Sequence, residues 1–174
     1  MLDVCSLSEP TTMRVSEYLS DQHIAFEEMV HPPAFTSEKL AKSLHISGRQ
    51  VMKSILLKGP QGFFLAVLPA AQLIDLPRLN MHFIGTVRLA AVEELSERFT
   101  DCEWGALMPF GQLYGLKTIL ESTIHLDEEI VFEAQRHAVA IRMLCRDYVK
   151  LERPERLAFA RDRATPAHHR PRAS

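Results

Sequence analysis

The chain has 174 residues, of which 47% are hydrophobic and 24% charged, a composition typical of a soluble globular domain. Its net charge of −2 excludes the strongly basic field of many nucleic-acid-binding proteins, and no apolar run approaches the roughly 20 residues that a membrane helix needs. The first residues lack the basic and apolar regions of a secretory signal, so we expect a cytoplasmic protein with no membrane contact.

The N-terminal third is predicted to alternate between helix and strand. Apolar residues at helical spacing predict a helix over residues 12–22, and alternating apolar residues predict a strand over residues 23–29. Two prolines end that strand, because proline cannot donate to a sheet ladder. A second helix should follow from Thr36 or Ser37 and end at Gly48.

A β-hairpin is the clearest pattern in the middle of the chain. Residues 51–58 and 63–68 are apolar-rich strands, and a turn with two glycines and a proline separates them. The elements predicted after this hairpin are a helix over 74–80, a strand over 87–90, a helix over 92–99, strands over 117–120, 130–133 and 138–143, and a helix from 147 to 152.

This order predicts an α+β fold, a mixed β-sheet with surrounding helices, because the elements do not follow a regular βαβ repeat. We expect a lead-in over residues 1–11, one domain over 12–153 and a basic, flexible tail over 154–174. Residues 151–174 hold six arginines against three acidic residues. Such a tail can contact RNA phosphates, and a solvated, frayed terminus is the alternative.

No familiar metal or nucleotide motif is present. The histidines are scattered, and Cys5, Cys102 and Cys145 have neither disulfide-framework nor zinc-ligand spacing. We therefore expect no metal ion and no cofactor. Cys102 and Cys145 are interpreted as buried structural residues, with a role as nucleophiles as the alternative.

Three local features are candidates for chemistry. The segment HPPAFT, from His31 to Thr36, leads into a helix whose first N–H groups could face an anion or a carbonyl; an ordinary capped loop is the alternative. Lys53 shares a strand face with aliphatic residues, so it is paired or functional unless it lies on an edge strand or extends its amine to solvent. The segment GALMPFGQLYG, from Gly105 to Gly115, is apolar although glycine and proline bar it from a helix, which indicates either a buried loop or a pocket wall.

Taken in order, HPPAFT, KSILL, VLPAAQLIDLPRL, GALMPFGQLYG and IVFEAQRHAVAIRM resemble the YbaK/ProX family of aminoacyl-tRNA deacylases. The same domain occurs as the editing insertion of bacterial prolyl-tRNA synthetases. The resemblance covers roughly residues 12–150. It implies a mixed sheet with helices and an enzyme that edits in trans, hydrolysing the ester between a small, wrongly attached amino acid and the 3′-terminal adenosine of tRNA. The implied partners are the tRNA acceptor end and an aminoacyl-tRNA synthetase.

The resemblance also implies site residues. Lys53 and His137 are the candidate catalytic residues, although a sheet histidine can equally be structural. Lys53 would hold the ester or the terminal phosphate, and backbone N–H groups of residues 105–111 would bind the carbonyl oxygen. The expected substrate-binding residues are His31, Phe35, Thr36, Ser54, Gly105, Leu107, Met108, Pro109, Phe110 and Gly111. Among them, Leu107 to Phe110 should form a pocket wall opposite Phe35 and Lys53.

Two positions depart from the family pattern. Met108 stands where many relatives have proline or serine, and Gln135 stands where glycine is frequent. The alternative function is a non-catalytic module that binds a tRNA end or a small ligand, and a third is docking on a synthetase through the arginine-rich tail. Removal of residues 155–174 is expected to weaken tRNA binding without loss of folding. The sequence predicts neither the amino acid, the tRNA nor the oligomeric state.

Overall fold

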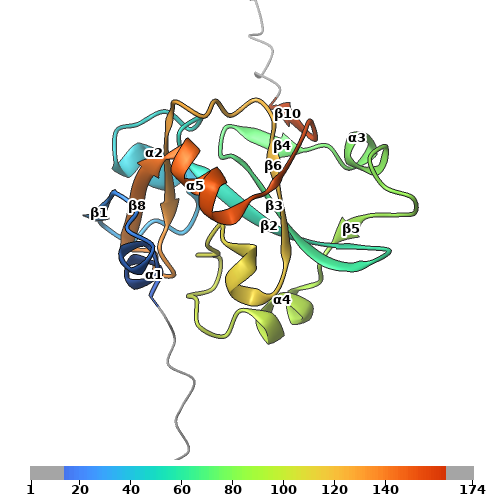
Figure 1. The fold of residues 1–174 in the computed structure, drawn as a ribbon, viewed down its shortest axis with the longest axis horizontal. Coiled ribbons are helices and arrows are strands. Elements are labelled where there is room, and N and C mark those ends of the chain that lie inside the picture. The colour runs from blue at the N-terminus through green and yellow to red at the C-terminus, as the bar shows by residue number, and fades with distance from the viewer. Residues whose placement is uncertain (1–13, 164–174) are drawn as a thin grey trace, which may run out of the picture.

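The structure is a computed structural model that describes residues 14–163 (Figure 1). Three β-sheets and the helices packed against them form this part of the chain, which confirms the expected α+β class. The three-stranded sheet lies on the left in Figure 1, and the five-stranded sheet runs through the centre. Within residues 14–163, no helix is long and apolar enough to cross a membrane.

The five-stranded sheet is built on the predicted hairpin. Strands β2 (Met52–Gly59) and β3 (Gly62–Pro69) pair antiparallel along their whole length. Strand β6 (Lys117–Glu121) lies parallel to β3, and β9 (Glu155–Leu157) lies parallel to β6. The short strand β5 (Arg88–Leu89) forms the other edge, beside β2.

The three-stranded sheet has the antiparallel order β1 (Phe26–Val30), β8 (Val139–Leu144) and β7 (Glu129–Glu133). A single parallel bridge between Val51 and Val131 joins this sheet to the start of β2. The two sheets therefore meet at one point and enclose the main core between them.

Two of the helices begin at a capping side chain. Thr36 accepts a hydrogen bond from the N–H of Lys39 at the start of α2, and Asp75 does the same for the N–H of Arg78 at the start of α3. The helices are α1 (Val15–Asp21), α2 (Ser37–Ser43), α3 (Leu76–Asn80), α4 (Val92–Arg98) and α5 (Cys145–Glu152), and a 3₁₀-helix covers Gly111–Tyr114.

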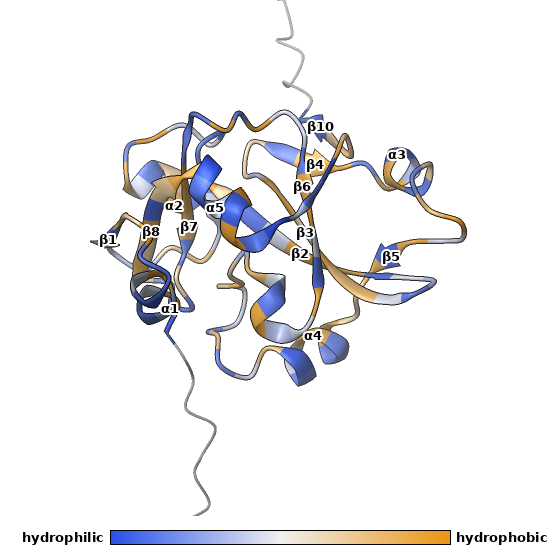
Figure 2. Ribbon diagram, in the orientation of Figure 1, coloured by the Kyte–Doolittle hydropathy of each residue, from blue (hydrophilic) through white to orange (hydrophobic). Residues whose placement is uncertain are grey.

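Apolar residues gather in the central strands, whereas exposed parts of α4 and α5 are hydrophilic (Figure 2). The main core joins residues from both sheets with α1, α5 and the segment before β6, and it contains Leu19, Phe110, Phe132 and Tyr148. A second cluster, which includes Phe159, covers the other side of the five-stranded sheet. Because Phe110 belongs to the main core, the glycine-rich segment is packed into the fold.

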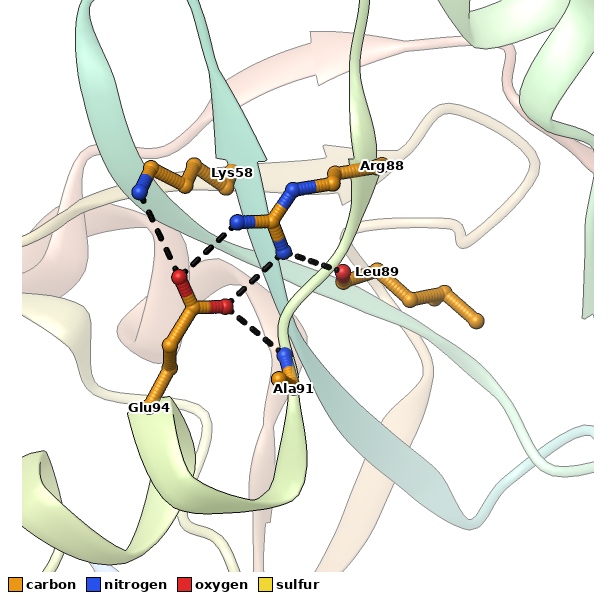
Figure 3. Close-up of polar contacts among 5 residues, drawn as sticks. All are labelled: Lys58, Arg88, Leu89, Ala91 and Glu94. Carbon is orange, nitrogen blue, oxygen red and sulfur yellow. Dashed lines mark hydrogen bonds and ion pairs between the residues drawn. The ribbon is translucent and has the colours of Figure 1, made fainter.

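A charged network ties the edge strand β5 to α4 (Figure 3). The carboxylate of Glu94 accepts two hydrogen bonds of 2.8 Å from Arg88, one of 3.3 Å from Lys58 and one of 2.8 Å from the N–H of Ala91. The hydrogen bonds from Arg88 in particular hold the pKa of Glu94 far below its usual range. This network anchors the otherwise short strand β5.

The chain beyond Pro154 differs from the expected tail. Residues up to 163 continue the fold, because β9 pairs with β6 and β10 (Ala160–Asp162) pairs with β4 (Gln72–Ile74). Phe159, between β9 and β10, is fully buried. The expectation that this part is dispensable for folding is therefore corrected for residues 155–163; residues 164–174 lie outside the described part. The segment has a single short apolar run, residues 157–160, without strand alternation, so only its pairing partners reveal the two strands.

Strand β4 is also absent from the sequence-based prediction, which placed residues 74–80 in one helix. Helix α3 begins only at Leu76, because Asp75 caps it and the three residues before Asp75 pair with β10. The pairing partner is more than 80 residues away in the chain, so local pattern carries no signal for it.

Candidate functional site

The turn between β7 and β8, residues 134–138, connects two of the segments that the sequence singled out. It contacts HPPAFT on one side and the residues just before and at Gly105 on the other. Three backbone hydrogen bonds make these connections: His31 N to Ala138 O (3.0 Å), Ala34 N to His137 O (2.9 Å) and Glu103 N to Gln135 O (2.8 Å). Segments about 70 residues apart in sequence are thereby held at one place.

His137 lies at the centre of this junction. Its side chain is buried, with Nε2 2.7 Å from the carbonyl oxygen of Trp104 and Nδ1 3.2 Å from Oε1 of Glu133. The ring of Phe35 packs against the imidazole with a centroid distance of 4.8 Å. Glu103 accepts a 2.7 Å hydrogen bond from the backbone N–H of His137.

The environment of His137 pulls its pKa in both directions. Burial lowers it, but the hydrogen bonds to Glu133 and to the carbonyl of Trp104 raise it, and the pKa lies above its ordinary value. Both ring nitrogens are engaged within the protein. This arrangement favours the structural alternative for His137 over a free general base.

Gln135 adopts the left-handed conformation, with φ of 64°, a conformation that glycine adopts without strain. Its side chain compensates through two hydrogen bonds: Oε1 accepts from the N–H of Val15 at 3.1 Å, and Nε2 donates to Asp101 at 3.0 Å. The turn before His137 therefore keeps its shape without glycine, and the amide group adds a link to α1.

The exposed start of residues 105–111, here called the glycine–proline segment, adjoins a small cavity. Gly105 is exposed and has φ of 88°, a conformation that disfavours any side chain. The cavity has a volume of about 200 Å³ and a mostly apolar lining of Leu95, Ser96, Phe99, Cys102, Glu103, Trp104, Gly105 and Leu107. Of the expected pocket residues, Gly105 and Leu107 are thus placed at a cavity.

The following residues turn inward, which corrects the expected pocket wall. Met108 and Phe110 are 1% and 0% exposed and pack in the main core. The ring of Phe110 makes edge contacts with three other aromatic rings, and the carbonyl of Pro109 accepts a 2.7 Å hydrogen bond from Tyr148. Hydrophobic burial draws these side chains away from the surface, so they anchor the segment.

Gly111 ends the segment at a point with no room for a side chain. A Cβ there would lie 2.4 Å from the hydroxyl oxygen of Thr118 and 2.9 Å from the carbonyl oxygen of Leu116. The same hydroxyl donates a 2.5 Å hydrogen bond to buried Glu152, which also accepts from the N–H of Gln112 at 3.2 Å. Burial raises the pKa of Glu152 to about 7, and these hydrogen bonds oppose that shift.

Lys53 lies in β2, in a half-buried position. Its Nζ donates to the carbonyls of Ala70 at 3.4 Å and Gln72 at 2.5 Å, both at the end of β3 and the start of β4. These are its hydrogen-bond partners within residues 14–163, so one of its three N–H groups has none there. Burial lowers the pKa of Lys53, while Glu38 raises it and Arg163 lowers it further.

Strand β10 contributes to the surroundings of Lys53. Gln72, whose carbonyl binds Lys53, donates its side-chain amide to Asp162 at 3.2 Å, and Arg163 pairs with Glu38. The predicted convergence of Lys53 with residues 105–111 stays a prediction. Lys53 does not line the cavity at Gly105, and within residues 14–163 no hydrogen bond links it to that segment.

The remaining predicted site residues differ in their exposure. Phe35 is 66% exposed, and Thr36 is exposed with its hydroxyl engaged in capping α2. His31 is buried; Nδ1 lies 2.8 Å from the carbonyl of Pro32, whereas Nε2 has no partner within the described residues. The Ser54 hydroxyl is likewise buried without a partner there.

Sequence reasoning missed the acidic residues that organise the site. Glu103 and Glu133 contact His137, and Glu152 binds the far end of the glycine–proline segment. Glu133 lies within the motif IVFEAQRHAVAIRM without being singled out there, and Glu103 and Glu152 lie in no recognisable motif. Trp104 was also missed, although the chain's single tryptophan directly precedes Gly105 and is 61% exposed. Its place as the single tryptophan directly before a glycine was the one available sequence signal.

The cysteines fit the structural interpretation. Cys145 is fully buried, and burial raises the pKa of Cys102 and of Cys145 to about 11, so both thiols stay protonated at neutral pH. Residues 14–163 contain no group of three or more histidine, cysteine or acidic side chains placed to hold a metal ion.

Comparison with known proteins agrees with the family that the sequence motifs resemble. The family model of the aminoacyl-tRNA editing domain matches residues 31–151. A multifunctional Ser/Thr-tRNA deacylase, ProXp-y, of Escherichia coli strain K12 is 28% identical over 158 residues, which cover 87% of this chain and 93% of the relative. A proline–tRNA ligase of Kosmotoga olearia is 28% identical over 101 residues, 58% of this chain and 17% of the ligase.

A solved structure shares the fold. It is described as a candidate trans-editing enzyme for prolyl-tRNA synthetase, and it superimposes with a TM-score of 0.72 at 21% identity, covering 88% of this chain and 98% of that protein. The matched residues 31–151 include Lys53, the glycine–proline segment and the turn that carries His137. The chain belongs to the aminoacyl-tRNA editing domain family.

Proposed function

We propose that this chain hydrolyses the ester that joins a small, wrongly attached amino acid to the 3′-terminal adenosine of a tRNA, acting in trans. One observation carries the proposal: in a chain of the editing family, HPPAFT and the start of the glycine–proline segment converge on the turn around His137. The competing proposal is a module that binds the tRNA end without turnover.

The reaction makes modest demands on the protein. An aminoacyl ester is already activated, so the site has to orient the ester, place a water molecule and stabilise the oxyanion of the tetrahedral intermediate. The exposed backbone at Gly105 can approach the ester closely, because no Cβ intervenes. The remaining N–H group of Lys53 is the proposed electrostatic contact to the ester or the terminal phosphate.

We propose seryl, threonyl or alanyl groups as the preferred acyl groups. The cavity of about 200 Å³ at Gly105 and Leu107 is small, and each methylene of misfit changes binding by about 1–3 kcal/mol. The E. coli relative is named as a Ser/Thr-tRNA deacylase. A size-selective site would reject bulky aromatic acyl groups.

The tRNA end is proposed to contact the exposed aromatic side chains beside His137. Phe35 and Trp104 are 66% and 61% exposed, and both adjoin His137. Unpaired bases stack on such rings with about 1–3 kcal/mol per base. We also propose an aminoacyl-tRNA synthetase as a partner, given the partial similarity to a proline–tRNA ligase. We propose that the protein encounters tRNA and synthetase in the cytoplasm.

A deacylation panel tests the proposal. Purified protein should hydrolyse seryl-, threonyl- or alanyl-tRNA faster than phenylalanyl-tRNA. Lys53→Ala should lower kcat/KM by about 100-fold or more, a loss typical for removal of one oxyanion contact, while the protein still folds. Lys58→Ala, on the same strand but bound to Glu94, is the matched control and should keep its activity.

Three outcomes would contradict parts of this proposal. A wild-type rate in Lys53→Ala would remove the role of Lys53. Equal hydrolysis of alanyl- and phenylalanyl-tRNA would remove the size-selective cavity. Binding of uncharged tRNA without hydrolysis of any ester would establish the non-catalytic module instead.

A further inference from the structure

Glu133 and His137 form a buried pair that extends to the backbone of the glycine–proline segment. Each residue is 7% exposed, and the 3.2 Å contact between Nδ1 and Oε1 joins them. On its other side, Nε2 of His137 lies 2.7 Å from the carbonyl oxygen of Trp104. The chain of contacts therefore runs from β7 through the imidazole to the residue before Gly105.

The number of protons in this pair follows from its partners. A carbonyl oxygen can only accept, so Nε2 must carry a hydrogen to make its contact with Trp104. The opposite contact joins a ring nitrogen to a carboxyl oxygen, and it needs one further proton, on Nδ1 or on Glu133. The pair thus holds two protons. Loss of either one sets an acceptor against an acceptor in one of the two contacts.

We propose that Glu133 is a positioning residue that acts through His137. It keeps the imidazole doubly protonated, so that Nε2–H braces the carbonyl of Trp104 and holds Gly105 in the conformation in which its backbone meets the substrate. The inference rests on the proposed function, because Gly105 is assigned to the ester there. It assigns His137 as a brace for the loop, with no role as general base.

The surrounding charges favour the protonated form of the pair. Glu133, from β7, and Glu103, from the segment before Gly105, both raise the pKa of His137 against the lowering effect of burial. Phe35 faces the ring from the segment before α2 and is uncharged. Since the pKa of His137 lies above its ordinary value, the brace should be intact below that raised pKa and open as the pH rises through it.

An NMR titration tests the brace without any substrate. In the wild-type protein, the Cε1–H signal of His137 and the amide signal of Gly105 should shift with one common midpoint, above the usual histidine value of about 6.5. Glu133→Gln should lower that midpoint by one pH unit or more. Glu129→Gln changes an exposed glutamate of the same strand and should leave the midpoint unchanged.

A second variant covers the case in which Glu133→Gln does not fold. In His137→Gln, the side-chain amide can donate to the carbonyl of Trp104 but does not titrate. The Gly105 amide signal should then become independent of pH between 5 and 9, and kcat/KM for the best aminoacyl-tRNA should stay within about tenfold of wild type, which corresponds to about 1.4 kcal/mol.

The pH dependence of kcat/KM separates positioning from a merely structural role. After subtraction of spontaneous hydrolysis, the wild-type rate should fall at alkaline pH with the midpoint of His137, and Glu133→Gln should move this fall to lower pH while recovering activity near pH 6. The inference is overturned if Glu133→Gln lowers kcat/KM equally at every pH. It is also overturned if the Gly105 amide signal does not shift with the titration of His137. If the wild-type protein hydrolyses no aminoacyl-tRNA, the proposed function fails. The NMR titration still tests by itself whether His137 holds Gly105 in place.

Discussion

At the residue scale, Gln135 shows how a side chain can replace a glycine in a left-handed position. A non-glycine residue with φ of 64° costs roughly 1 kcal/mol, and the two hydrogen bonds of its amide to Val15 and Asp101 offset that cost at about 1 kcal/mol each. Glutamine is therefore tolerated because of what its side chain reaches.

Substitution of Gln135 tests this balance. Gln135→Ala keeps the strained conformation and loses both hydrogen bonds, so the free energy of unfolding should fall by about 2–3 kcal/mol. Gln135→Gly loses the same bonds but relieves the strain, and it should be roughly 1 kcal/mol more stable than the alanine variant. Urea unfolding measures both. Equal stability of the two variants would show that the conformation is not strained.

At the element scale, buried Glu152 joins the end of α5 to the 3₁₀-helix that follows the glycine–proline segment. Its carboxyl group accepts hydrogen bonds from Thr118 and Gln112, and burial raises its pKa to about 7. In the unfolded chain the same group loses its proton near pH 4.3, roughly the usual glutamate value. Between these two values the folded state holds a proton that the unfolded state has lost, so stability falls as the pH rises.

We therefore expect the free energy of unfolding to drop by about 1–3 kcal/mol between pH 4.5 and pH 7, apart from contributions of other groups. Glu152→Gln keeps an acceptor oxygen and removes the titration, so it should flatten this part of the profile and stabilise the protein at pH 8. Glu155→Gln, at an exposed position in β9, is the control. An unchanged profile in Glu152→Gln would assign the pH dependence to another group.

The element scale also explains why the glycine–proline segment is apolar. Its first residues, Gly105 and Leu107, border a cavity, while Met108 and Phe110 are buried in the main core. The segment is thus a buried loop in one half and a cavity wall in the other, and these are the two alternatives that its composition left open. The buried half anchors the exposed half, which a binding segment needs if its backbone is to stay in place.

At the scale of the whole molecule, the chain after residue 153 completes both the sheet and the surroundings of Lys53. Truncation after Arg153 removes β9, β10 and fully buried Phe159, and the free energy of unfolding should fall by about 3–5 kcal/mol, the usual cost of losing a buried phenylalanine. Deacylation should fall with it, because β10 pairs with the strand whose carbonyl binds Lys53. Thermal unfolding and the deacylation rate measure the two effects.

Truncation after Arg163 is the matched control. It removes Arg170 and Arg172 together with the rest of residues 164–174, which lie outside the described part. We expect its stability to equal that of the full chain, and the prediction that these arginines raise tRNA affinity is then testable through the salt dependence of binding. Equal stability of both truncations would contradict a structural role for β9 and β10.

Much of the architecture is predictable from local sequence. The hairpin, the strands of the three-stranded sheet and the helix that starts after Thr36 follow from apolar periodicity and capping residues, and the structure differs there mainly at element ends. Strands β4, β9 and β10 are not predictable in this way. Each has three paired positions whose partners lie far away in the chain, and pairing across such distances leaves no local periodicity in the sequence.

The sequence by itself determined the fold class, the family and the segments that carry the site, because periodicity, capping and ordered motifs are written along the chain. Only the tertiary structure decided which side chains of those segments face outward. It turned Phe110 into the core, left Trp104 exposed and brought Glu133 and Glu103 to His137. Charge and burial depend on neighbours from distant segments, so the surroundings of His137 could be described only when those neighbours were in place.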